Sequence, residues 1–245
     1  MRYSLALLLL MPVILFNSCK NITGTRSELG IPPSRVYFSF DDGPSAGDDT
    51  TARLLDVLEK YQVRALFSLL GENSENCPDL VKRIYNDGHC IINHGYADEW
   101  AWKMDSDEFR NNLILGEEAI SAALGFNMNP KLYRPHGAYY YFKQKKIISN
   151  EGYTIVPVTV WVHDAIKTAA SQKKIVRRIV RTLEKQGGGI VLLHDVRGSY
   201  SNQKVQMEKR PKGAFNRSWI PDAVEEVIIH LLEKDFILDE PFIYF

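Results

Sequence analysis

The sequence predicts an α/β protein, a deformed (β/α)7-8 barrel in a single domain. Apolar runs of strand length alternate with amphipathic segments of helical spacing from about residue 34 to the C-terminus. This alternation is typical of parallel strands joined by right-handed helical crossovers. About six or seven such units occur, with no internal repeat and no sign of a second domain. That number of units favours a barrel.

The individual elements are predicted from hydrophobic spacing and from signals at their ends. Strands are expected where apolar residues run together, at residues 36–40, 65–69, 90–93, 154–162 and 190–193. Helices are expected where apolar residues recur at helical spacing, at residues 50–61, 78–86, 105–124, 145–150, 173–185 and 221–234. Residues 197–217 are polar and basic, and we expect a solvated loop there, with the basic rim of a substrate groove as the alternative.

The composition is that of a globular protein without a strong charge bias. Of the 245 residues, 45% are hydrophobic and 24% are charged, which allows a sizeable buried core. Thirty lysines and arginines balance thirty aspartates and glutamates. Because a nucleic-acid partner would require a basic surface, no such partner is expected.

The N-terminal 19 residues are expected to form a lipoprotein-type signal peptide, followed by a linker at residues 20–33 and the folded domain at residues 34–245. The apolar run from Leu5 to Phe16 is too short to cross a bilayer comfortably and has the length of a secretory signal. It ends in a sequence similar to a bacterial lipoprotein box, in which Cys19 would carry the lipid. This predicts a bacterial cell-envelope protein, anchored to the membrane by lipid and facing the periplasm or the exterior. Plain secretion with an incidental cysteine is the alternative.

The other two cysteines are expected to remain free thiols. Cys77 and Cys90 lie at the two ends of an expected helix of about nine residues, which would separate them by roughly 13 Å. A disulfide requires α-carbons within about 7 Å of each other. Cys90 opens the following strand and is expected to be a small core residue.

Three of the expected strands end in ionisable residues, and functional groups in a barrel of this kind sit where strands end. The first strand ends in Asp41 and Asp42, and the Gly-Pro turn after them lets both carboxylates address one cavity. The second ends in His94, with Asp98 four residues later and on the same face if that segment is helical. The third ends in His194. Each ending alone suits an acidic turn or a structural histidine, but the three together favour a functional site.

Four segments resemble motifs of the polysaccharide deacetylase family, carbohydrate esterase family four. Residues 38–45 (FSFDDGPS) closely resemble its opening motif, and residues 88–94 (GHCIINH) resemble the approach to its second. Residues 133–137 (YRPHG) are similar to its third motif and residues 190–195 (IVLLHD) to its fifth. The resemblance covers nearly all of the chain after residue 34.

The resemblance implies a catalytic role for several matching residues. Asp41 would be the general base that accepts a proton from the attacking water, and Arg134 would orient and tune it. His194 would be the general acid that protonates the leaving group. A backbone N–H near His136 or Gly137 would help to hold the oxyanion. A base and an acid placed in this way suit hydrolytic acyl transfer.

The resemblance also implies a metal site. Asp42, His94 and Asp98 would bind a divalent cation, with zinc expected and cobalt, nickel or manganese as alternatives. Such an ion can activate water and polarise an acetyl carbonyl. Leu192, on the strand that leads to the acid histidine, would contact the substrate.

Two departures from the family concern the metal site. Asp98 stands where the family has its second metal histidine. A carboxylate still binds divalent ions, but two carboxylates would cancel the charge of the ion, so its water should be less acidic. His136 stands where proline is more common, which adds a titratable group near the site.

A third departure concerns the support of the acid histidine. The fourth motif of the family, an aspartate followed four residues later by tryptophan, aligns with Trp161 and Ala165. The carboxylate that would support His194 is therefore expected to be missing. Asp164 and Asp195 are candidate replacements, although neither corresponds to the motif.

Two functions remain open from the sequence. The first is a hydrolase that removes acetyl groups from a cell-wall or chitin-like polysaccharide, with N-acetyl favoured over O-acetyl. The second is a catalytically inactive relative that binds glycan. Loss of the second metal histidine and of the fourth motif favours the inactive relative. Retention of the catalytic set opposes it, because a binding protein needs neither a base nor an acid; that set is Asp41, Asp42, His94, Arg134 and His194.

Overall fold

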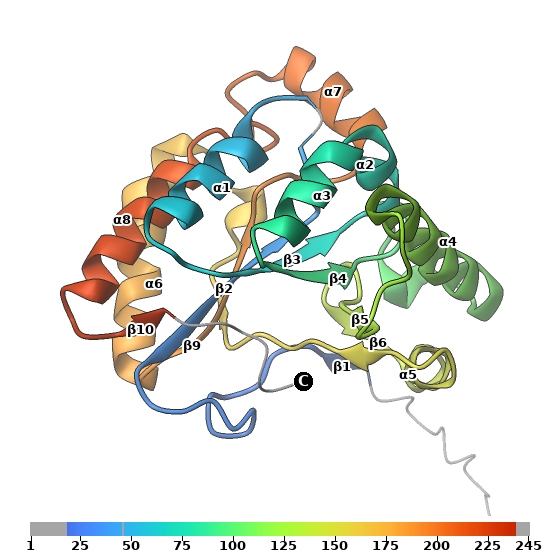
Figure 1. Ribbon diagram of the computed structural model, residues 1–245, viewed down its shortest axis with the longest axis horizontal. Helices are drawn as coiled ribbons and strands as arrows, with labels where there is room; N and C mark the ends of the chain where they lie inside the picture. Colours follow the sequence, from blue (N-terminus) through green and yellow to red (C-terminus); the bar gives the residue numbers. More distant parts are fainter. Residues whose placement is uncertain (1–18, 46, 239–245) are drawn as a thin grey trace, which may run out of the picture.

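The computed structural model describes residues 19–45 and 47–238 of the chain. Its centre is a curled, parallel sheet with the strand order β7-β5-β4-β3-β2-β9-β8, to which β10 adds beside β2 (Figure 1). This half-barrel forms one domain, so the predicted fold class is confirmed. The strands are β2 (Arg35–Asp41), β3 (Leu66–Leu69), β4 (Cys90–Asn93), β5 (Leu132–Tyr133), β7 (Thr154–Ile155), β8 (Val160–Trp161), β9 (Gly189–His194) and β10 (Ile237–Leu238).

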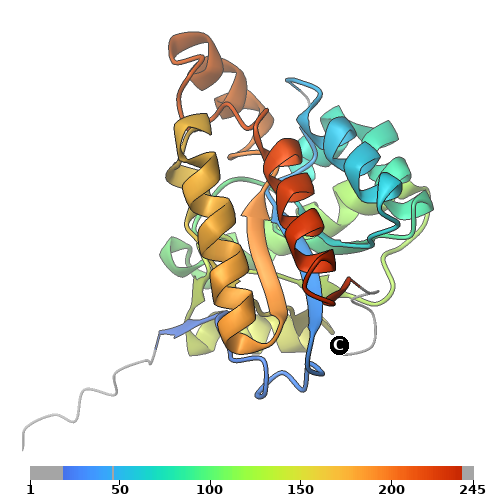
Figure 2. The ribbon, with the colours of Figure 1, turned by 90° about the vertical axis from the view of Figure 1, so that its left-hand side faces the viewer.

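Helices cover the outer face of the curled sheet (Figures 1 and 2). The last helix, α8, packs against α1 and α6, while α4 packs against α2 and α3. Their apolar faces meet the outward side chains of the strands in the main core, where Phe38, Phe40 and Phe67 are fully buried. The helices are α1 (Thr50–Lys60), α2 (Gly71–Asn76), α3 (Pro78–Asn86), α4 (Ser106–Leu124), α5 (Phe142–Asn150), α6 (Gln172–Gln186), α7 (Tyr200–Lys209) and α8 (Ile220–Leu232).

Helix α4 packs directly against the end of β4 and so positions the residue that follows it. A side chain at Gly116, in the middle of α4, would come within 2.5 Å of Oδ1 of Asn93 and within 2.7 Å of the backbone carbon of Gly95. The Asn93 side chain donates a hydrogen bond to the carbonyl of Leu113 and accepts one from the N–H of Gly95. His94 lies between these two anchored residues, so its backbone is held on both sides.

The segment that we expected to be a linker packs against the domain. Lys20–Asn21 forms strand β1, which pairs with β6 (Tyr139–Tyr140). Ile22 is buried, and its backbone exchanges hydrogen bonds with Ala138 and Val158. Residues 20–24 therefore belong to the fold, because they satisfy backbone groups at the opening of the half-barrel.

The predicted strand at residues 154–162 is two short strands. β7 pairs with β5, whereas β8 pairs with β9 at the other end of the sheet order. Residues 156–159 cross the opening between these two edges, and there Val158 bonds to the N-terminal segment instead of to a sheet strand. A continuous apolar run suits both a strand and a buried crossing, which explains the error.

The prediction for the cysteines is confirmed. Cys77 and Cys90 are both free, and Cys90 is buried at the start of β4. Residues 1–18, which carry most of the expected signal peptide, lie outside the described residues. Among the helices of the described part, none combines the length and the apolar character needed to cross a bilayer.

Candidate active site

The carboxyl ends of β2, β4, β5 and β9 surround one cavity of about 700 Å³. The parallel register places Asp41 beside His194 and Asn93 beside Tyr133, so the residues that follow these strands gather at one edge. The acidic and basic side chains that line the cavity are Asp41, Asp42, His94, Asp98, His136, His163, His194 and Arg197. All of the sequence-predicted ionisable site residues lie in this set except Arg134, which is buried behind it.

Asp41 is held by a buried arginine. It is the last residue of β2, and its Oδ1 accepts a hydrogen bond from Nη1 of Arg134. The same nitrogen donates to Oγ of Ser39 at 2.6 Å, and Nε of Arg134 donates to the carbonyl of Val156. The second oxygen of Asp41, Oδ2, lies 3.8 Å from Nε2 of His94. The arginine thus fixes a carboxylate whose free oxygen faces the histidine side of the cavity.

Asp42 turns into the same cavity because the backbone bends at this residue. Its φ angle is 72°, a left-handed conformation that breaks the alternation of side chains along the strand. Its carbonyl accepts a hydrogen bond from Nδ2 of Asn73, and its Oδ2 accepts one from the N–H of Gly198 at 2.9 Å. The other oxygen, Oδ1, is buried and has no hydrogen-bond partner among the described residues. A buried carboxylate oxygen without a donor is costly, and a bound cation would satisfy it.

His94 is oriented by the loop that follows β5. Its Nδ1 lies 2.8 Å from the carbonyl oxygen of Arg134. Because a carbonyl can only accept, Nδ1 carries the proton, and the lone pair of the neutral ring is on Nε2. That Nε2 lies 3.4 Å from the orphaned Oδ1 of Asp42. Metal-binding histidines are typically oriented by such a backbone acceptor.

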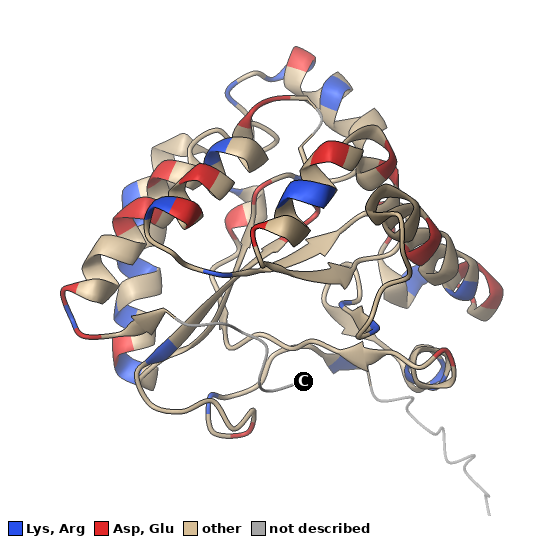
Figure 3. Ribbon diagram, viewed as in Figure 1, with Lys and Arg blue, Asp and Glu red and all other residues tan. Residues whose placement is uncertain are grey.

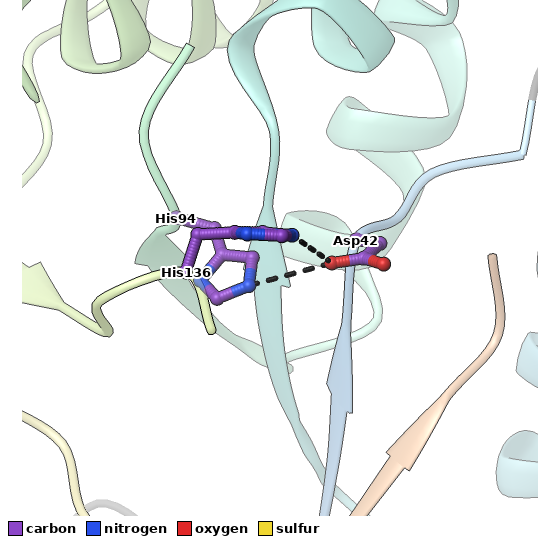
Figure 4. Close-up of side chains that lie close together, drawn as sticks. All are labelled: Asp42, His94 and His136. Carbon is purple, nitrogen blue, oxygen red and sulfur yellow. Dashed lines mark ion pairs between the residues drawn. The ribbon is translucent and has the colours of Figure 1, made fainter. Parts of the chain in front are cut away.

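The third member of this cluster is His136, which follows β5. Its Nε2 lies 3.5 Å from Oδ1 of Asp42, and the ligand atoms of Asp42, His94 and His136 all lie within 4.8 Å of one another (Figure 4). A tetrahedral zinc site with bonds of about 2.1 Å has ligand atoms roughly 3.4 Å apart. The donor set and its spacing therefore fit a divalent metal ion.

Asp98, which we expected as the third ligand, lies outside this group of three. Its Oδ1 is 2.8 Å from Nε2 of His136, so it contacts the cluster through that histidine. A side chain at Gly198 would collide with the other oxygen of Asp98. The sequence contained a signal that His136 could take the place expected for Asp98. The chain lacks a histidine in its second motif, at position 98, and has an additional one in its third, at position 136.

The charges in this cluster shift the proton affinities of its members. Burial alone would raise the pKa of Asp42, but the contacts with His136 and His94 outweigh it and hold the pKa well below its usual range. Burial would lower the pKa of His136, but Asp42 and Asp98 raise it to about 10. Without a metal, a proton on His136 thus neutralises the carboxylates, and a metal ion would have to displace it.

His194, at the end of β9, is supported by a carboxylate. Its Nδ1 lies 3.0 Å from Oδ1 of Asp164, and its backbone N–H donates to Oδ2 of the same residue. Burial would lower the pKa of His194, but the charge and hydrogen bond of Asp164, with the charges of Asp42 and Asp41, raise it to about 9. The imidazole is therefore protonated at neutral pH, which suits a proton donor.

Arg217 holds the partner of this histidine in place. Its guanidinium donates to the side chain and the carbonyl of Asp164 and to the carbonyl of His194. Arg217 is fully buried, and α7 occupies the middle of the region from residue 197 to 217. The expectation of a solvated loop at residues 197–217 was wrong. The region contains helix α7, and Arg217 at its end is buried against the carboxylate of Asp164.

Of the two candidate replacements for the fourth-motif carboxylate, Asp164 is the one that contacts His194. Trp161 and Ala165, which align with that motif, both line the cavity. Asp195, the other candidate, is fully buried and accepts a hydrogen bond from the hydroxyl of Thr51. Burial raises the pKa of Asp195 to about 7, and its side chain packs below the Gly-Pro turn rather than against the histidine.

The remaining predicted residues line the cavity. Gly137 has a φ angle of 76°, and a side chain there would press on the indole of Trp100 at 3.1 Å. Leu192 is buried on β9, two residues before His194 and so on the same face of the strand. Their roles as oxyanion and substrate contacts stay predictions. Aromatic side chains surround them, namely Trp100, Trp102, Tyr139, Tyr141, Trp161 and Phe215.

Comparison with known proteins agrees with this geometry. The family model described as polysaccharide deacetylase matches residues 30–156, about half of the chain. A peptidoglycan-N-acetylglucosamine deacetylase of Bacillus cereus is 33% identical over 173 residues, which are 70% of this chain and 60% of the relative. The chain therefore spans less than two thirds of the length of that relative.

Solved structures share the fold. A peptidoglycan N-acetylglucosamine deacetylase, crystallised with 4-naphthalen-1-yl-N-oxidanyl-benzamide, superposes with a TM-score of 0.67 at 31% identity and covers 82% of this chain and 83% of that chain. A pseudoenzyme of carbohydrate esterase family four from Bacillus anthracis has a TM-score of 0.62 at 19% identity, covering 85% of this chain and 66% of that one. Because the same fold occurs in both, activity has to be argued from the residues of the cavity.

Proposed function

Because the chain belongs to the polysaccharide deacetylase family, we propose that it is a metal-dependent hydrolase that removes acetyl groups from an N-acetylglucosamine-containing polysaccharide. The observation that carries this proposal is the arrangement of one cavity. An Asp-His-His cluster lies between a carboxylate held by Arg134 and a histidine held by Asp164. This arrangement contains the groups required for the hydrolysis of an acetyl bond.

Asp42, His94 and His136 would hold the metal ion. The ion would polarise the acetyl carbonyl and acidify the attacking water. Two nitrogens and one carboxylate oxygen suit zinc, and cobalt, nickel and manganese accept the same donors. This set leaves a net positive charge on a divalent ion, which the expected set with two carboxylates would have cancelled.

Asp41 would accept the proton of the attacking water. Its Oδ1 is occupied by Arg134, so Oδ2, on the side of His94, is the oxygen free to take that proton. His194 would then donate a proton to the leaving nitrogen. Its raised pKa keeps that proton available at neutral pH, and Asp164 stabilises the imidazolium before the transfer.

The substrate is proposed from the relatives and from the aromatic wall. The two relatives named above act on peptidoglycan N-acetylglucosamine. The tryptophans and tyrosines of the cavity offer flat apolar faces of the kind that pack against sugar rings. These features support N-deacetylation of a cell-wall or chitin-like glycan at the cell envelope, to which Cys19 would anchor the chain through lipid.

The inactive glycan-binding alternative loses its main support. It rested on the absence of a second metal histidine and of a carboxylate for the acid histidine. His136 lies beside Asp42 and Asp164 beside His194, so both kinds of group are present in the cavity. A protein that only binds glycan has no need of these replacements, so they favour the enzyme.

The test is acetate release from N-acetylglucosamine oligomers by the full chain, metal-free and then loaded with zinc or cobalt. We expect metal-dependent release, which Asp41→Asn abolishes while the metal content stays unchanged. The matched control is Asp56→Asn, which changes an exposed aspartate on α1. Absence of acetate from a metal-loaded, folded protein with every oligomer and chitin-like polymer tested would refute the enzyme and leave the glycan-binding protein.

A further inference from the structure

The N-terminal segment joins the domain at the wall of the cavity. Lys20 pairs with Tyr140 and Asn21 with Tyr139, and Cys19 lines the cavity together with Tyr141. No free length of chain separates Cys19 from this wall. A membrane that holds the lipid expected on Cys19 would therefore be kept close to the mouth of the cavity.

The surface beside this junction is basic and carries an exposed aromatic ring. The first residue of α5, Phe142, has 69% of its surface exposed and directly follows Tyr141. Lys143, Lys145 and Lys146 are exposed on the same helix, which contains no acidic residue (Figure 3). Within the described part of the chain, none of these three lysines takes part in an ion pair. Phe142, Lys143, Lys145 and Lys146 are called the α5 face below.

We propose that the α5 face docks on an anionic phospholipid bilayer, so that the cavity opens along the membrane surface. Basic side chains bind anionic headgroups, and an exposed aromatic ring enters the boundary between headgroups and acyl chains. The pairing of β1 with β6 places Cys19, the expected site of the lipid, beside this face. A predicted lipid anchor and a basic, aromatic helix start thus lie at the same edge of the fold.

A second basic surface offers a rival orientation. Helix α6 exposes more positive charge than α5, through Lys173, Lys174, Arg177, Arg178, Arg181 and Lys185. However, α6 has no large hydrophobic side chain among the exposed ones, and it lies on the opposite side of the molecule from α5 (Figure 1). Helix α6 therefore provides a matched control.

Docking through the α5 face would restrict which glycan the anchored protein can reach. This consequence rests on the proposed function. With the α5 face on the bilayer, the cavity would reach N-acetylglucosamine-containing glycan at the membrane surface. Glycan far from the membrane would be reached poorly by the anchored protein. The same protein released into solution would show no such restriction.

The orientation can be measured on the full chain reconstituted into vesicles. Tryptophan fluorescence is recorded with a nitroxide quencher on the lipid headgroup, because Trp100, Trp102 and Trp161 all line the cavity. Vesicles of phosphatidylcholine are compared with vesicles that contain phosphatidylglycerol as well. We expect strong quenching with the anionic vesicles. The triple variant Lys143→Gln/Lys145→Gln/Lys146→Gln should reduce that quenching at least twofold, and high salt should act in the same direction.

Two controls separate charge from hydrophobic contact. The triple variant Lys173→Gln/Lys174→Gln/Arg177→Gln removes the same charge from α6 and should leave the quenching unchanged. Phe142→Ser should weaken the quenching, whereas Phe126→Ser, which removes a ring 45% exposed beside Tyr85, should not.

Equal quenching with neutral and anionic vesicles, or equal effects of the α5 and α6 triple variants, would overturn the proposal. A third outcome would also overturn it: a soluble anionic polymer abolishes the quenching while the protein stays on the vesicle. The α5 face would then bind the polymer and not the bilayer. Acetate release from a soluble oligomer is measured on the same samples. A protein that is inactive but correctly oriented refutes only the proposed function, and an active protein without oriented quenching refutes only the docking.

Discussion

At the scale of single residues, two exchanges decide how the cavity is interpreted. His136 lies beside Asp42 and is our candidate for the imidazole that position 98 lacks, and Asp164 lies beside His194 and is our candidate for the carboxylate that the aligned fourth motif lacks. His136 comes from the loop after β5, a different segment from position 98, whereas Asp164 lies between Trp161 and Ala165, in the same segment as the aligned fourth motif. The proposed set then contains one carboxylate and two imidazoles at the metal, together with a proposed base and a proposed acid that contacts a carboxylate.

The first prediction separates a metal ligand from its neighbour. His136→Ala should leave the protein without metal after dialysis and without activity, because only Asp42 and His94 remain as ligands. Asp98→Asn removes the charge of a carboxylate that lies 2.8 Å from Nε2 of His136, the nitrogen proposed to bind the metal, so it should lower the metal affinity less than His136→Ala does. Metal content and affinity, measured by competition with a chelator, give the answer. Complete loss of metal in Asp98→Asn, with retention in His136→Ala, would restore Asp98 as the ligand.

The second prediction concerns His194, the proposed general acid. In Asp164→Asn the charge that raises the pKa of His194 is lost, so the pKa falls and the histidine gives up its proton at lower pH. Activity should fall by about 10²- to 10⁴-fold at neutral pH, and the alkaline limb of the pH profile should move to lower pH. Asp195→Asn, on the neighbouring buried residue, serves as the control for general loss of fold. A profile whose alkaline limb stays in place would show that Asp164 does not tune the acid.

At the scale of elements, the N-terminal segment closes the half-barrel that the sheet leaves open. β7 and β8 end the strand order and do not pair with each other among the described strands. The backbone of Ile22 bonds to Ala138 on one side and to Val158 on the other. Ala138 lies two residues after His136, so the segment also braces the loop that carries this proposed metal ligand.

The third prediction tests this bracing. Ile22 is 3% exposed, and Ile22→Ala should lower the free energy of unfolding by about 2–4 kcal/mol, the usual cost of truncating a buried isoleucine. Ile229→Ala, at a residue 40% exposed on α8, should change it by less than about 1 kcal/mol. Denaturant unfolding measures both. A neutral Ile22→Ala would mean that the segment is the dispensable linker expected from composition.

At the scale of the whole molecule, the cavity concentrates buried charge in a chain whose net charge is zero. Asp164 and Asp42 have lowered pKa values, and His194 and His136 have raised ones. Each pair stabilises the fold only while both partners are charged. The metal-free protein should therefore lose stability at acidic pH, where the carboxylates take up protons, and at alkaline pH, where the histidines lose theirs.

The fourth prediction follows for the alkaline side. The pKa of His194 is about 9 in the fold, against about 6.5 for an unfolded histidine, so its contribution is complete below about pH 6.5 and is lost as the pH rises through 9. The denaturant midpoint of the metal-free protein should fall over this window. In His194→Gln the denaturant midpoint should fall less over the same pH window, and the fall that remains should come from the deprotonation of His136. An equal fall in the wild type and His194→Gln would exclude this histidine as the cause.

The amino-acid sequence predicts the fold class, most element bounds and most of the charged residues that line the cavity. Local rules sufficed for these features. Helix α3 and strand β4 have the predicted bounds, because apolar spacing and end signals act within a few residues. Asp41, Asp42, His94 and His194 were found because parallel strands bring their carboxyl ends to one edge.

Which residues complete the cluster around Asp42 depends on contacts between segments that are distant in the sequence. Asp98 is close to His94 in sequence, whereas His136 follows β5 and comes close to His94 because β5 pairs with β4. Spacing along the chain carries no information about that contact. The same holds for Arg217, which pairs with Asp164 across 53 residues, and for Ile22, which closes the barrel from the far end of the chain. Long-range partners depend on how the sheet curls, and that curl is a property of the packed whole.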